Sequence, residues 1–447
     1  MFDYDLISIG SGSSGRTTAV LLKRAGWKVA IIEANVSEHF GGTCINTGCI
    51  PTKAMIYKSL QHAPFNEVLT HRDKVVQKIH DGTVRHVKSS VEIEIIEGKA
   101  EFVDLHTVKV GERLLTSDYF VVATGSKPAI PPISGIKEVK FSTSDEILKL
   151  KSPPNHLITI GGGRIGLELS LMLHNMGTHV TVIEALEHLI PGEDKEIVSE
   201  IESSLQNRGI KILTGQFVES VEQNGTNYRV RLKGGETYEG DCLFLATGRI
   251  PRTENLGLDK IGVFVDRGGI KVNEYLQTNI SHIFAAGDVI GNPMFTNWAH
   301  FQATFLAANL KKSKNNSNEW SKLPERVIPR VTFITPELAS VGLTEDEAKE
   351  KYGDDVVTYS FKVRWLGKSL VLEQTEGVYK GIGIRGKNTI IGAHLWGEKA
   401  GSLIQMIVLA MENNLGWNEL NSLIYPHPVL SEGIMGMASG VARQINE

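Results

Sequence analysis

Two stretches of the chain repeat one pattern of apolar runs, glycine-rich turns and helical segments. In residues 6–33 an apolar run enters the turn GSGSSG, a helical segment follows, and a second apolar run ends at Glu33. Residues 157–184 repeat this order with the turn GGGRIG and end at Glu184. Short apolar runs bounded by such turns are typical of buried parallel strands. Each stretch is therefore predicted to form a βαβ unit.

Each predicted unit is closed by a later strand that ends in Ala-Thr-Gly, at Gly125 and at Gly248. A further apolar run, FAAGDV at residues 284–289, is predicted to be a short buried strand of the first unit. The polar stretch KKSKNNSNEW at residues 311–320 is predicted to be a solvated loop at a domain boundary.

Beyond this stretch, strand-like and helical patterns alternate, which predicts a third domain of the α+β type. Its helix at residues 399–412 carries an apolar stripe formed by Leu403, Ile404, Ile407, Val408 and Met411. Periodicity alone is equally consistent with a core stripe and with a surface that contacts another subunit. The predicted fold class is α/β, with two Rossmann-like dinucleotide-binding domains and a C-terminal α+β domain.

Composition narrows the range of functions. The 447 residues include 47 basic and 51 acidic side chains, which give a formal net charge of −4 without long runs of one sign. Such a distribution provides no surface for nucleic acid or anionic lipid. No apolar run reaches the roughly 18 residues that a membrane-spanning helix needs. We therefore predict a soluble, cytoplasmic protein that binds neither nucleic acid nor membrane.

Both glycine-rich turns have the spacing GxGxxG between a predicted strand and a predicted helix. Glycines at these positions form the tight turn, let the backbone approach a pyrophosphate, and open a helix whose positive end faces the anion. An acid at the end of the second strand accepts hydrogen bonds from ribose hydroxyls. The predicted cofactor contacts are Gly10, Gly12, Gly15 and Glu33 in the first copy, and Gly161, Gly163, Gly166 and Glu184 in the second.

The acid at position 184 also bears on which nicotinamide dinucleotide binds. A carboxylate there repels a ribose 2′-phosphate, whereas a site for that phosphate would require arginine. The segment ALEHLIP after Glu184 contains no arginine. The second site is therefore predicted to favour NAD(H) over NADP(H). Asp288, directly after Gly287, is placed either to bind a polar cofactor chain or to serve as a turn aspartate.

A pair of cysteines, Cys44 and Cys49, follows the first unit in GGTCINTGCIPTK. On a regular helix their Cα atoms would be about 8 to 9 Å apart, and a disulfide needs less than about 7 Å. A bonded pair therefore requires a bend, which Gly48 and Pro51 would permit. A redox-active disulfide, a zinc site and a pair of inert thiols all remain open, although no second CxxC or histidine pair is near. Cys242 is predicted to be a core residue.

Four motifs, GGTCINTGCIPTK, GGGRIGLE, FAAGDV and PHPVLSE, together resemble those of the flavin-dependent pyridine nucleotide-disulfide oxidoreductases. This family includes dihydrolipoamide dehydrogenase, glutathione reductase and mercuric reductase, and the resemblance covers nearly the whole chain. It implies an FAD-binding domain at residues 1–148 and 271–325, an NAD(H)-binding domain at 149–270, and a domain at 326–447 that forms the interface of a homodimer.

The resemblance also implies roles for individual side chains. Cys44 matches the cysteine that exchanges with substrate, and Cys49 matches the one that contacts the flavin. Lys53 and Glu168 match an ion pair beside the flavin. His427 matches the acid–base residue, and Glu432 matches the carboxylate that orients it; family members supply this pair across the subunit boundary. Further implied cofactor contacts are Gly42, Thr43, Lys53, Thr124, Gly125, Gly248 and Asp288.

The substrate is less clearly indicated. Glu184 favours the NAD-using dihydrolipoamide dehydrogenases, so our working hypothesis is such an enzyme, acting on a small-molecule or lipoyl-domain thiol or disulfide. Arg164, where many members have an aromatic residue, and the segment FTNWAHFQA favour the alternative, a reductase of another small disulfide or oxidised electrophile. Two hypotheses from other classes are a metal-chelating, nucleotide-regulated binding module and a flavin oxidase.

Overall fold

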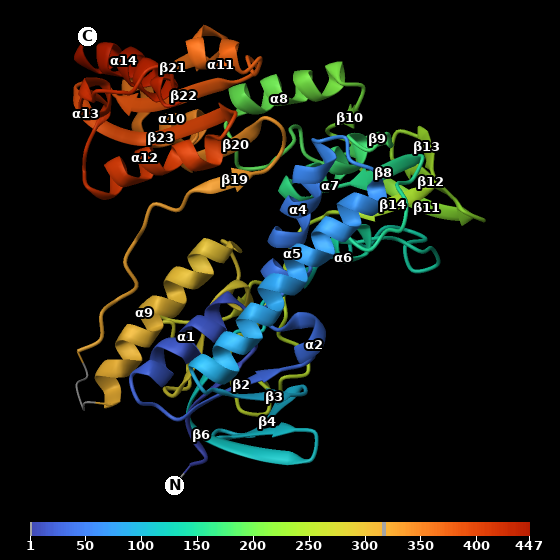
Figure 1. Cartoon of the computed structure of the whole chain (residues 1–447), viewed down its shortest axis with the longest axis vertical. Helices are drawn as coiled ribbons and strands as arrows, with labels where there is room; N and C mark the ends of the chain where they lie inside the picture. The colour runs from blue at the N-terminus through green and yellow to red at the C-terminus, as the bar shows by residue number, and fades with distance from the viewer. Residues whose placement is uncertain (1, 315–318) are drawn as a thin grey trace. The chain divides into compact units, whose positions relative to one another are not determined.

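The computed structural model describes residues 2–314 and 319–447, whose contacts form two compact units. The first contains Met1–Pro131, Thr143–Ser152 and Gly248–Pro324. The second contains Pro132–Ser142, Pro153–Thr247 and Glu325–Glu447. Figure 1 labels the elements of both. The predicted division into three domains, with boundaries after residues 148, 270 and 325, stays a prediction.

The first unit is built on a sheet with strand order β3-β2-β1-β6-β5-β4, in which β18 also pairs with β6. Strands β3, β2, β1, β6 and β18 are parallel, whereas β4 and β5 extend β6 as antiparallel strands. The predicted βαβ unit and the strand within FAAGDV are thereby confirmed. The strands are β1 Tyr4–Ile9, β2 Val29–Glu33, β3 Glu94–Glu97, β4 Ala100–Asp104, β5 Thr107–Val110, β6 Arg113–Val122, β7 Ser126–Pro128, β15 Arg249–Pro251, β16 Val265–Asp266, β17 Gly269–Ile270 and β18 Ile283–Ala285.

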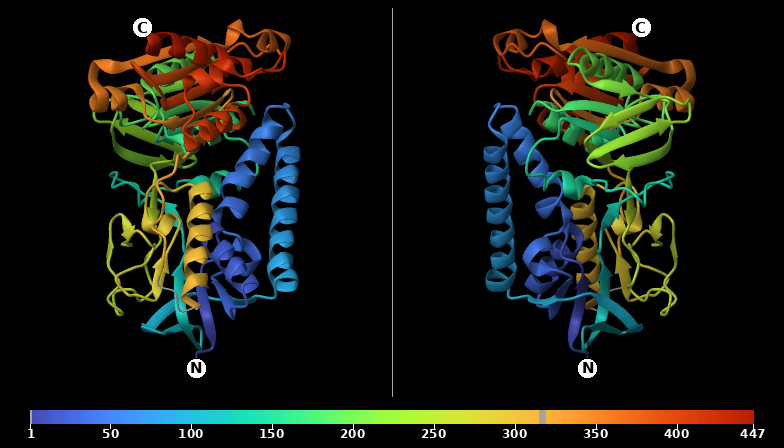
Figure 2. Two further views of the ribbon diagram at one scale, coloured as in Figure 1. Left: turned by 90° about the vertical axis from the view of Figure 1, so that its left-hand side faces the viewer. Right: turned by 90° about the vertical axis from the view of Figure 1, so that its right-hand side faces the viewer.

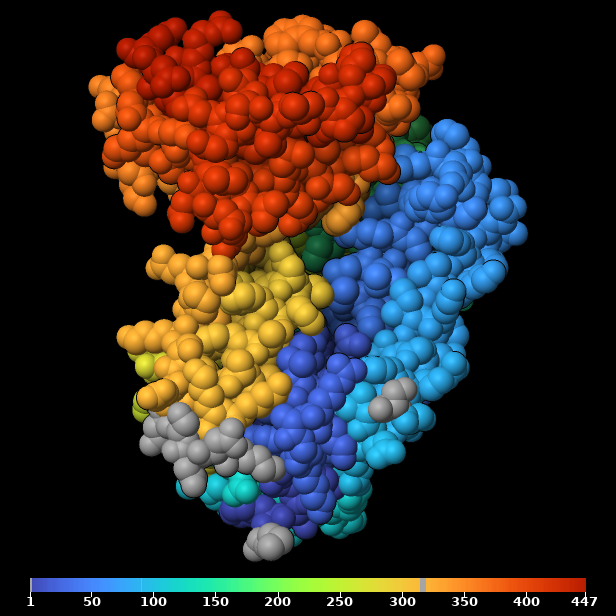
Figure 3. Space-filling view, turned by 60° about the vertical axis from the view of Figure 1, so that its left-hand side comes forward, coloured from blue at the N-terminus to red at the C-terminus, as the bar shows by residue number. Residues whose placement is uncertain are grey.

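Helices of this unit position the cysteine segment and the first glycine turn. Helix α9 packs against α1, and the space-filling view shows the yellow α9 segment against the blue N-terminal segment (Figure 3). Helices α4 and α5 pack together as an antiparallel pair (Figure 2). The helices are α1 Ser13–Arg24, α2 Val36–His39, α3 Thr43–Asn46, α4 Cys49–Ser59, α5 Phe65–Arg85, η1 His86–Ser90, α6 Ser144–Ile147, η2 Asp288–Ile290 and α9 Thr296–Lys314.

The loop predicted at residues 311–320 is wrong in its first part, because α9 continues to Lys314. The apolar side chains of Leu306 and Leu310 are fully buried in the core shared with α1. This packing extends the helix into the polar stretch, and lysines in a last helical turn interact favourably with the helix dipole. Residues 315–318 of the prediction lie outside the described part of the chain.

The second unit begins with the second repeat, a parallel sheet of order β10-β9-β8-β14. This arrangement confirms the second predicted βαβ unit. Cys242 in β14 is buried, as predicted, and burial raises the pKa of its thiol to about 11. The elements are β8 His156–Ile160, α7 Arg164–His174, β9 His179–Ile183, α8 Lys195–Asn207, β10 Lys211–Leu213, β11 Val218–Asn224, β12 Asn227–Leu232, β13 Thr237–Gly240 and β14 Cys242–Leu245.

The C-terminal part of this unit is an antiparallel sheet of order β19-β20-β23-β22-β21 with helices packed on it. This confirms the predicted α+β domain. In the stripe of α12, Ile404 and Ile407 are fully buried in the core, and Leu403, Val408 and Met411 are partly buried against it. The elements are β19 Arg330–Thr332, β20 Glu337–Gly342, α10 Glu345–Tyr352, η3 Gly353–Asp355, β21 Val356–Lys362, η4 Val363–Trp365, α11 Gly367–Val371, β22 Val378–Ile384, β23 Lys387–Gly397, α12 Ala400–Glu412, α13 Trp417–Ser422 and α14 Glu432–Asn446.

No helix in the described part of the chain combines the length and the apolar character needed to span a membrane.

Candidate functional site

The first glycine-rich turn joins β1 to α1 and leaves the start of that helix accessible to a ligand. Gly10 has a φ of +106°, and a Cβ atom on it would lie 2.4 Å from the carbonyl oxygen of Ala123. A Cβ atom on Gly15 would lie 2.1 Å from the carbonyl oxygen of Gly10. Gly12 is the N-cap of α1 and offers no side-chain cap to the first amides. These amides and the positive helix end therefore fit the pyrophosphate of a dinucleotide such as FAD.

Ser11, within this turn, connects Glu33, the acid predicted to bind ribose hydroxyls, to the cysteine segment. Its amide and hydroxyl donate hydrogen bonds to Glu33 at 3.1 and 2.5 Å. Its hydroxyl oxygen accepts a hydrogen bond from the amide of Gly41 at 2.9 Å. Next to it, a Cβ atom on Gly42 would lie 2.7 Å from the Cα atom of Gly12. Ser11 was not predicted as a site residue, and its position inside the turn is the one sequence signal that indicates such a role.

The two cysteines lie on separate short helices. Helix α3 begins at Thr43 and ends at Asn46, and α4 begins at Cys49 with Gly48 as its N-cap. The chain therefore bends between Cys44 and Cys49, as a bonded pair requires. The first position of α4 also places Cys49 at the positive end of a helix, where a thiolate is favoured.

The side chains of Cys44 and Cys49 form a hydrogen bond with each other, and both cysteines are free in the structure. The hydrogen bond with Cys49, followed by burial and the charge of Cys49, raises the pKa of the Cys44 thiol. A hydrogen bond with Thr296 and the charge of Lys53 oppose this rise. The hydroxyl oxygen of Thr296 lies 3.7 Å from Cys49 Sγ. In this pair Cys49 therefore favours the protonated form of Cys44, whereas Thr296 and Lys53 favour its thiolate.

Asn46 fixes the short helix that carries Cys44. Its side-chain amide donates hydrogen bonds to the carbonyl oxygens of Phe40 and Gly42, at 3.0 and 2.9 Å. Its carbonyl oxygen lies 3.0 Å from Nδ1 of His80, a buried residue of α5. His80 was not predicted as a site residue, because no motif near it along the chain indicates this contact.

The loops after the two Ala-Thr-Gly strands lie together in the first unit. Gly125 and Gly248, at which those strands were predicted to end, have φ angles of +72° and +102°. Strands β7 and β15, which follow them, pair as antiparallel strands. The hydroxyl of Thr124 donates a hydrogen bond of 2.6 Å to the carbonyl oxygen of Arg252.

Asp288 is held against these loops. Its carboxylate accepts a hydrogen bond of 2.6 Å from the hydroxyl of Ser126. The guanidinium of Arg249 donates to that hydroxyl at 2.7 Å and to the carbonyl oxygen of Ser126 at 2.9 Å. Burial lowers the pKa of Arg249, and the charge of Asp288 opposes this effect. Asp288 is thus part of a built polar arrangement and not an isolated turn aspartate, whereas Ser126 and Arg249 were missed by the sequence analysis.

The second glycine-rich turn repeats the geometry of the first. Gly161 has a φ of +107°, and a Cβ atom on it would lie 2.4 Å from the carbonyl oxygen of Ala246. Gly163 is the N-cap of α7, and a Cβ atom on Gly166 would lie 2.1 Å from the carbonyl oxygen of Gly161. The start of α7 therefore fits a second pyrophosphate.

Glu184 and Glu168 both follow this second turn along the chain. The Glu184 carboxylate accepts hydrogen bonds from the amides of Gly162 and Leu186, at 2.7 and 2.9 Å. Glu168, on α7, is buried and accepts a hydrogen bond of 2.9 Å from the amide of Phe333. Its predicted partner Lys53 belongs to the first unit, so their ion pair stays a prediction.

His427 and Glu432 form a hydrogen-bonded pair within the second unit. Nδ1 of His427 lies 2.9 Å from Glu432 Oε1, and the amide of Val429 donates to Oε2 at 2.9 Å. These two bonds lower the pKa of Glu432. The carboxylate therefore holds Nδ1, while the His427 side chain is 77% exposed. This arrangement leaves Nε2 directed away from Glu432 and able to exchange a proton with an external group.

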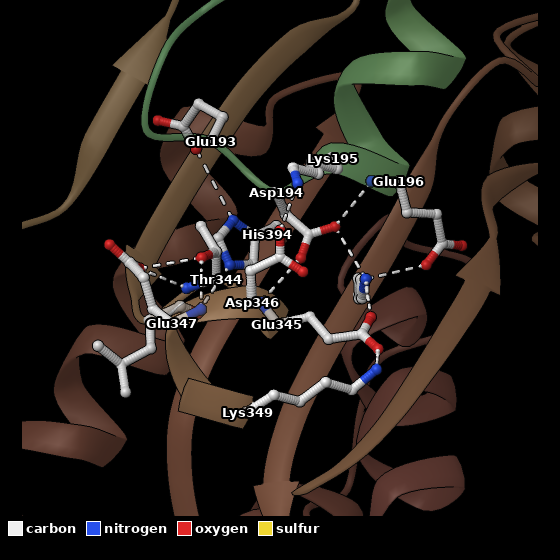
Figure 4. A network of polar contacts seen from close by, with 12 residues as sticks. Glu193, Asp194, Lys195, Glu196, Thr344, Glu345, Asp346, Glu347, Lys349 and His394 are labelled. Carbon is white, nitrogen blue, oxygen red and sulfur yellow. Dashed lines mark hydrogen bonds and ion pairs between the residues drawn. The ribbon is translucent and has the colours of Figure 1, made fainter. Parts of the chain in front are cut away.

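A network of charges links the segment before α8 to the C-terminal sheet, and Figure 4 shows its part around Glu193, Asp194 and His394. Glu193, whose side chain is 1% exposed, is paired with Arg164 and lies 3.2 Å from Nε of Arg330. Its other oxygen lies 3.7 Å from Nδ1 of His394. Although burial raises the pKa of Glu193, these neighbours lower it to about 2. Arg164 stands where the resemblance implies an aromatic residue in many family members, and it is held by the carboxylate of Glu193.

The same network continues from Glu193 to a buried lysine. Asp194, the N-cap of α8, lies 2.8 Å from Nζ of Lys380 in β22. Glu345 and Glu196 lie 2.6 and 3.0 Å from the same nitrogen. Burial lowers the pKa of Lys380, but these carboxylates outweigh burial and raise it. The result is a charged lysine that connects the loop before α8 with the C-terminal sheet.

Replacing Glu193 by glutamine is expected to destabilise this unit at neutral pH. A folded-state pKa of about 2 lies below the ordinary value of 4.5, so Glu193 stabilises the fold above about pH 4.5 and loses this effect as the pH falls towards 2. The shift corresponds to about 3 kcal/mol. Urea unfolding from pH 7 to pH 3 should therefore show a lower midpoint at pH 7 and a smaller acid-induced loss in Glu193→Gln. The exposed control Glu350→Gln should match the unaltered protein; equal acid sensitivity of both variants would contradict the assignment.

Among the described residues, no group of three or more histidine, cysteine, aspartate or glutamate side chains is arranged to hold a metal ion.

Comparisons with known proteins agree with the predicted resemblance. The pyridine nucleotide-disulphide oxidoreductase family model matches residues 4–303, and the model of the family's dimerisation domain matches residues 328–438. A mercuric reductase of Staphylococcus aureus is 37% identical over 97% of this chain and 81% of its own length. A dihydrolipoyl dehydrogenase of Thermus scotoductus is 33% identical over 99% of this chain and 98% of its own length.

A solved structure extends the similarity to the fold. The HOCl-induced flavoprotein disulfide reductase RclA from Escherichia coli has a TM-score of 0.92 and 31% identity, covering 98% of this chain and 99% of its own. These matches span both units and include the dimerisation domain. The chain therefore belongs to the pyridine nucleotide-disulphide oxidoreductase family, flavoprotein enzymes whose cofactors are FAD and NAD(P)H.

Proposed function

We propose that the chain is an NAD(P)H-dependent reductase of a small disulfide or another oxidised electrophile. The observation that carries this proposal is the hydrogen-bonded pair of Cys44 and Cys49 beside a glycine cradle for a dinucleotide. The similarity to a mercuric reductase and to a flavoprotein disulfide reductase supports this function over our working hypothesis of a dihydrolipoamide dehydrogenase. For a disulfide substrate, NAD(P)H, a proton and RSSR would yield NAD(P)⁺ and two RSH.

In this proposal Cys44 and Cys49 act in two successive steps. Cys44, as a thiolate, attacks one substrate sulfur and forms a mixed disulfide while the first thiol leaves. Cys49 then attacks the sulfur of Cys44, re-forms the protein disulfide and releases the second thiol. When bound, FAD supplies the two-electron link between the nicotinamide and the cysteine pair.

The remaining site residues would contribute an ion pair at the FAD site and proton transfer. Lys53 and Glu168 would form an ion pair at the FAD site. His427, oriented by Glu432, would remove the proton from an incoming thiol and return it to a leaving one. We propose that this pair acts on the cysteines of a partner subunit, because the dimerisation domain supports a homodimer.

We also propose that NADH is preferred over NADPH. The Glu184 carboxylate is fixed by the backbone amides of Gly162, in the second turn, and of Leu186, just after β9. A fixed negative charge favours ribose hydroxyls and repels a 2′-phosphate.

A substrate panel tests the proposed function. With NADH, turnover is expected with glutathione disulfide, hypothiocyanite or mercuric ion, and weaker turnover with lipoamide or with dihydrolipoamide and NAD⁺. NADPH in place of NADH should lower kcat/KM by about tenfold or more, which corresponds to about 1.4 kcal/mol. Highest activity with dihydrolipoamide and NAD⁺ would restore the working hypothesis. Oxygen consumption unchanged in Cys44→Ser would instead identify a flavin oxidase.

A further inference from the structure

Arg16 is a partly buried cation that none of the family motifs accounts for. It lies in the first turn of α1, one residue after the last glycine of the first turn motif. The side chain is partly buried, and its Nε atom is shielded from solvent with no hydrogen-bond partner among the described residues. Burying a guanidinium is unfavourable unless an anion compensates it. The position therefore calls for a negative charge nearby.

The backbone brings this cation to the cysteine pair. Gly12 is the N-cap of α1, and Gly42 is the N-cap of α3. A Cβ atom on Gly42 would lie 2.7 Å from the Cα atom of Gly12, so the two helices begin in contact. Arg16 lies four residues after one N-cap and Cys44 two residues after the other. Consistent with this placement, the charge of Cys44 acts on Arg16.

Cys44 needs a cation if it is to react. Its neighbours are Cys49, Thr296, Lys53 and Arg16, and of these Cys49 raises the pKa of the Cys44 thiol while Thr296 and Lys53 lower it. The attacking form in thiol–disulfide exchange is the thiolate. Burial lowers the pKa of Arg16, but a guanidinium still keeps its proton in proteins.

We propose that Arg16 stabilises the thiolate form of Cys44 and thereby sets the reactivity of the thiol that exchanges with substrate. This inference rests on the proposed function only in taking Cys44 as the exchange thiol. Arg16 acts through its charge on the reacting sulfur, so lysine should replace it in part and glutamine should not.

The test measures the reactivity of the Cys44 thiol and requires no substrate. In the FAD-bound Cys49→Ser protein, alkylation of Cys44 by iodoacetamide is followed by mass spectrometry from pH 5 to pH 10. Adding Arg16→Gln should raise the apparent pKa of Cys44 by about one unit and lower its alkylation rate near pH 7 about tenfold. Arg16→Lys should restore most of the rate. Arg24→Met, which removes an exposed arginine from the last turn of the same helix, should change nothing.

Two results would overturn the proposal. One is an alkylation profile that Arg16→Gln leaves unchanged. The other is loss of FAD from folded Arg16→Gln and Arg16→Lys proteins, which would assign Arg16 to the cofactor. If the glutamine variant does not fold, Arg16→Met in the Cys49→Ser protein decides: an apparent pKa of Cys44 raised by about one unit supports the proposal, and an unchanged pKa contradicts it. Failure here would leave the substrate panel unaffected, so the two proposals fail separately.

Discussion

Replacing Cys44 by serine is expected to lower NAD(P)H-driven disulfide reduction by at least about 10³-fold while FAD remains bound, because a serine hydroxyl cannot form a mixed disulfide. Cys49→Ser should be equally inactive for a different reason. In that variant Cys44 attacks the substrate, one thiol leaves, and the mixed disulfide on Cys44 persists because no second sulfur resolves it. Mass spectrometry after incubation with a disulfide should find this adduct in Cys49→Ser and not in Cys44→Ser.

The third cysteine provides the control for this pair. Cys242 is buried in β14, and burial raises the pKa of its thiol, so Cys242→Ser should retain turnover and form no adduct. An adduct in Cys44→Ser instead of Cys49→Ser would reverse the two assigned roles. Turnover that persists in both active-site variants would remove the cysteines from the reaction.

Replacing His427 by glutamine is expected to lower turnover by about 10² to 10⁴-fold, the usual range for loss of a general acid–base group. FAD binding should be unaffected. Glu432→Gln should have a smaller effect, because it removes the orienting carboxylate but leaves the imidazole. Hydrogen bonds from His427 and from the Val429 amide lower the pKa of Glu432, so its carboxylate stays charged across the neutral range and supports His427 there. Steady-state kinetics from pH 6 to pH 9 measures both effects, and the exposed His86→Gln serves as the control.

Mixed dimers test whether this pair acts on the partner subunit. His427→Gln and Cys44→Ser homodimers should each be inactive. If the base acts across a twofold interface, a dimer of one chain of each kind contains one complete site. Random mixing makes half of the dimers mixed, so about a quarter of full activity should return. Mixtures that stay inactive, although mixed dimers form, would place the base in the same chain as the cysteines that it serves.

The parts of the fold that could be predicted from sequence are those in which a short segment has only one good conformation. The glycine turns are one case: Gly10 and Gly161 adopt positive φ angles and approach a neighbouring strand so closely that a side chain would clash. The cysteine segment is another, because a bonded pair spaced five apart requires the bend observed at Gly48.

Contacts between distant segments could not be predicted in this way. His80 and Asn46 are 34 residues apart, and Ser126 and Arg249 are 123 apart. The buried Lys380 is an extreme case, since a lysine within a strand is normally read as solvent-exposed. Its charge is compatible with burial only because a segment almost two hundred residues earlier supplies Asp194.

The contact between Gly12 and Gly42 has a consequence for engineering. Because a Cβ atom on Gly42 would lie 2.7 Å from the Cα atom of Gly12, the redox loop can approach the nucleotide loop only with bare backbone at position 42. A chimera that imports a foreign cysteine segment would therefore have to import a matching first loop with it. The two loops therefore fit each other only as a matched pair, even though they lie thirty residues apart in the sequence.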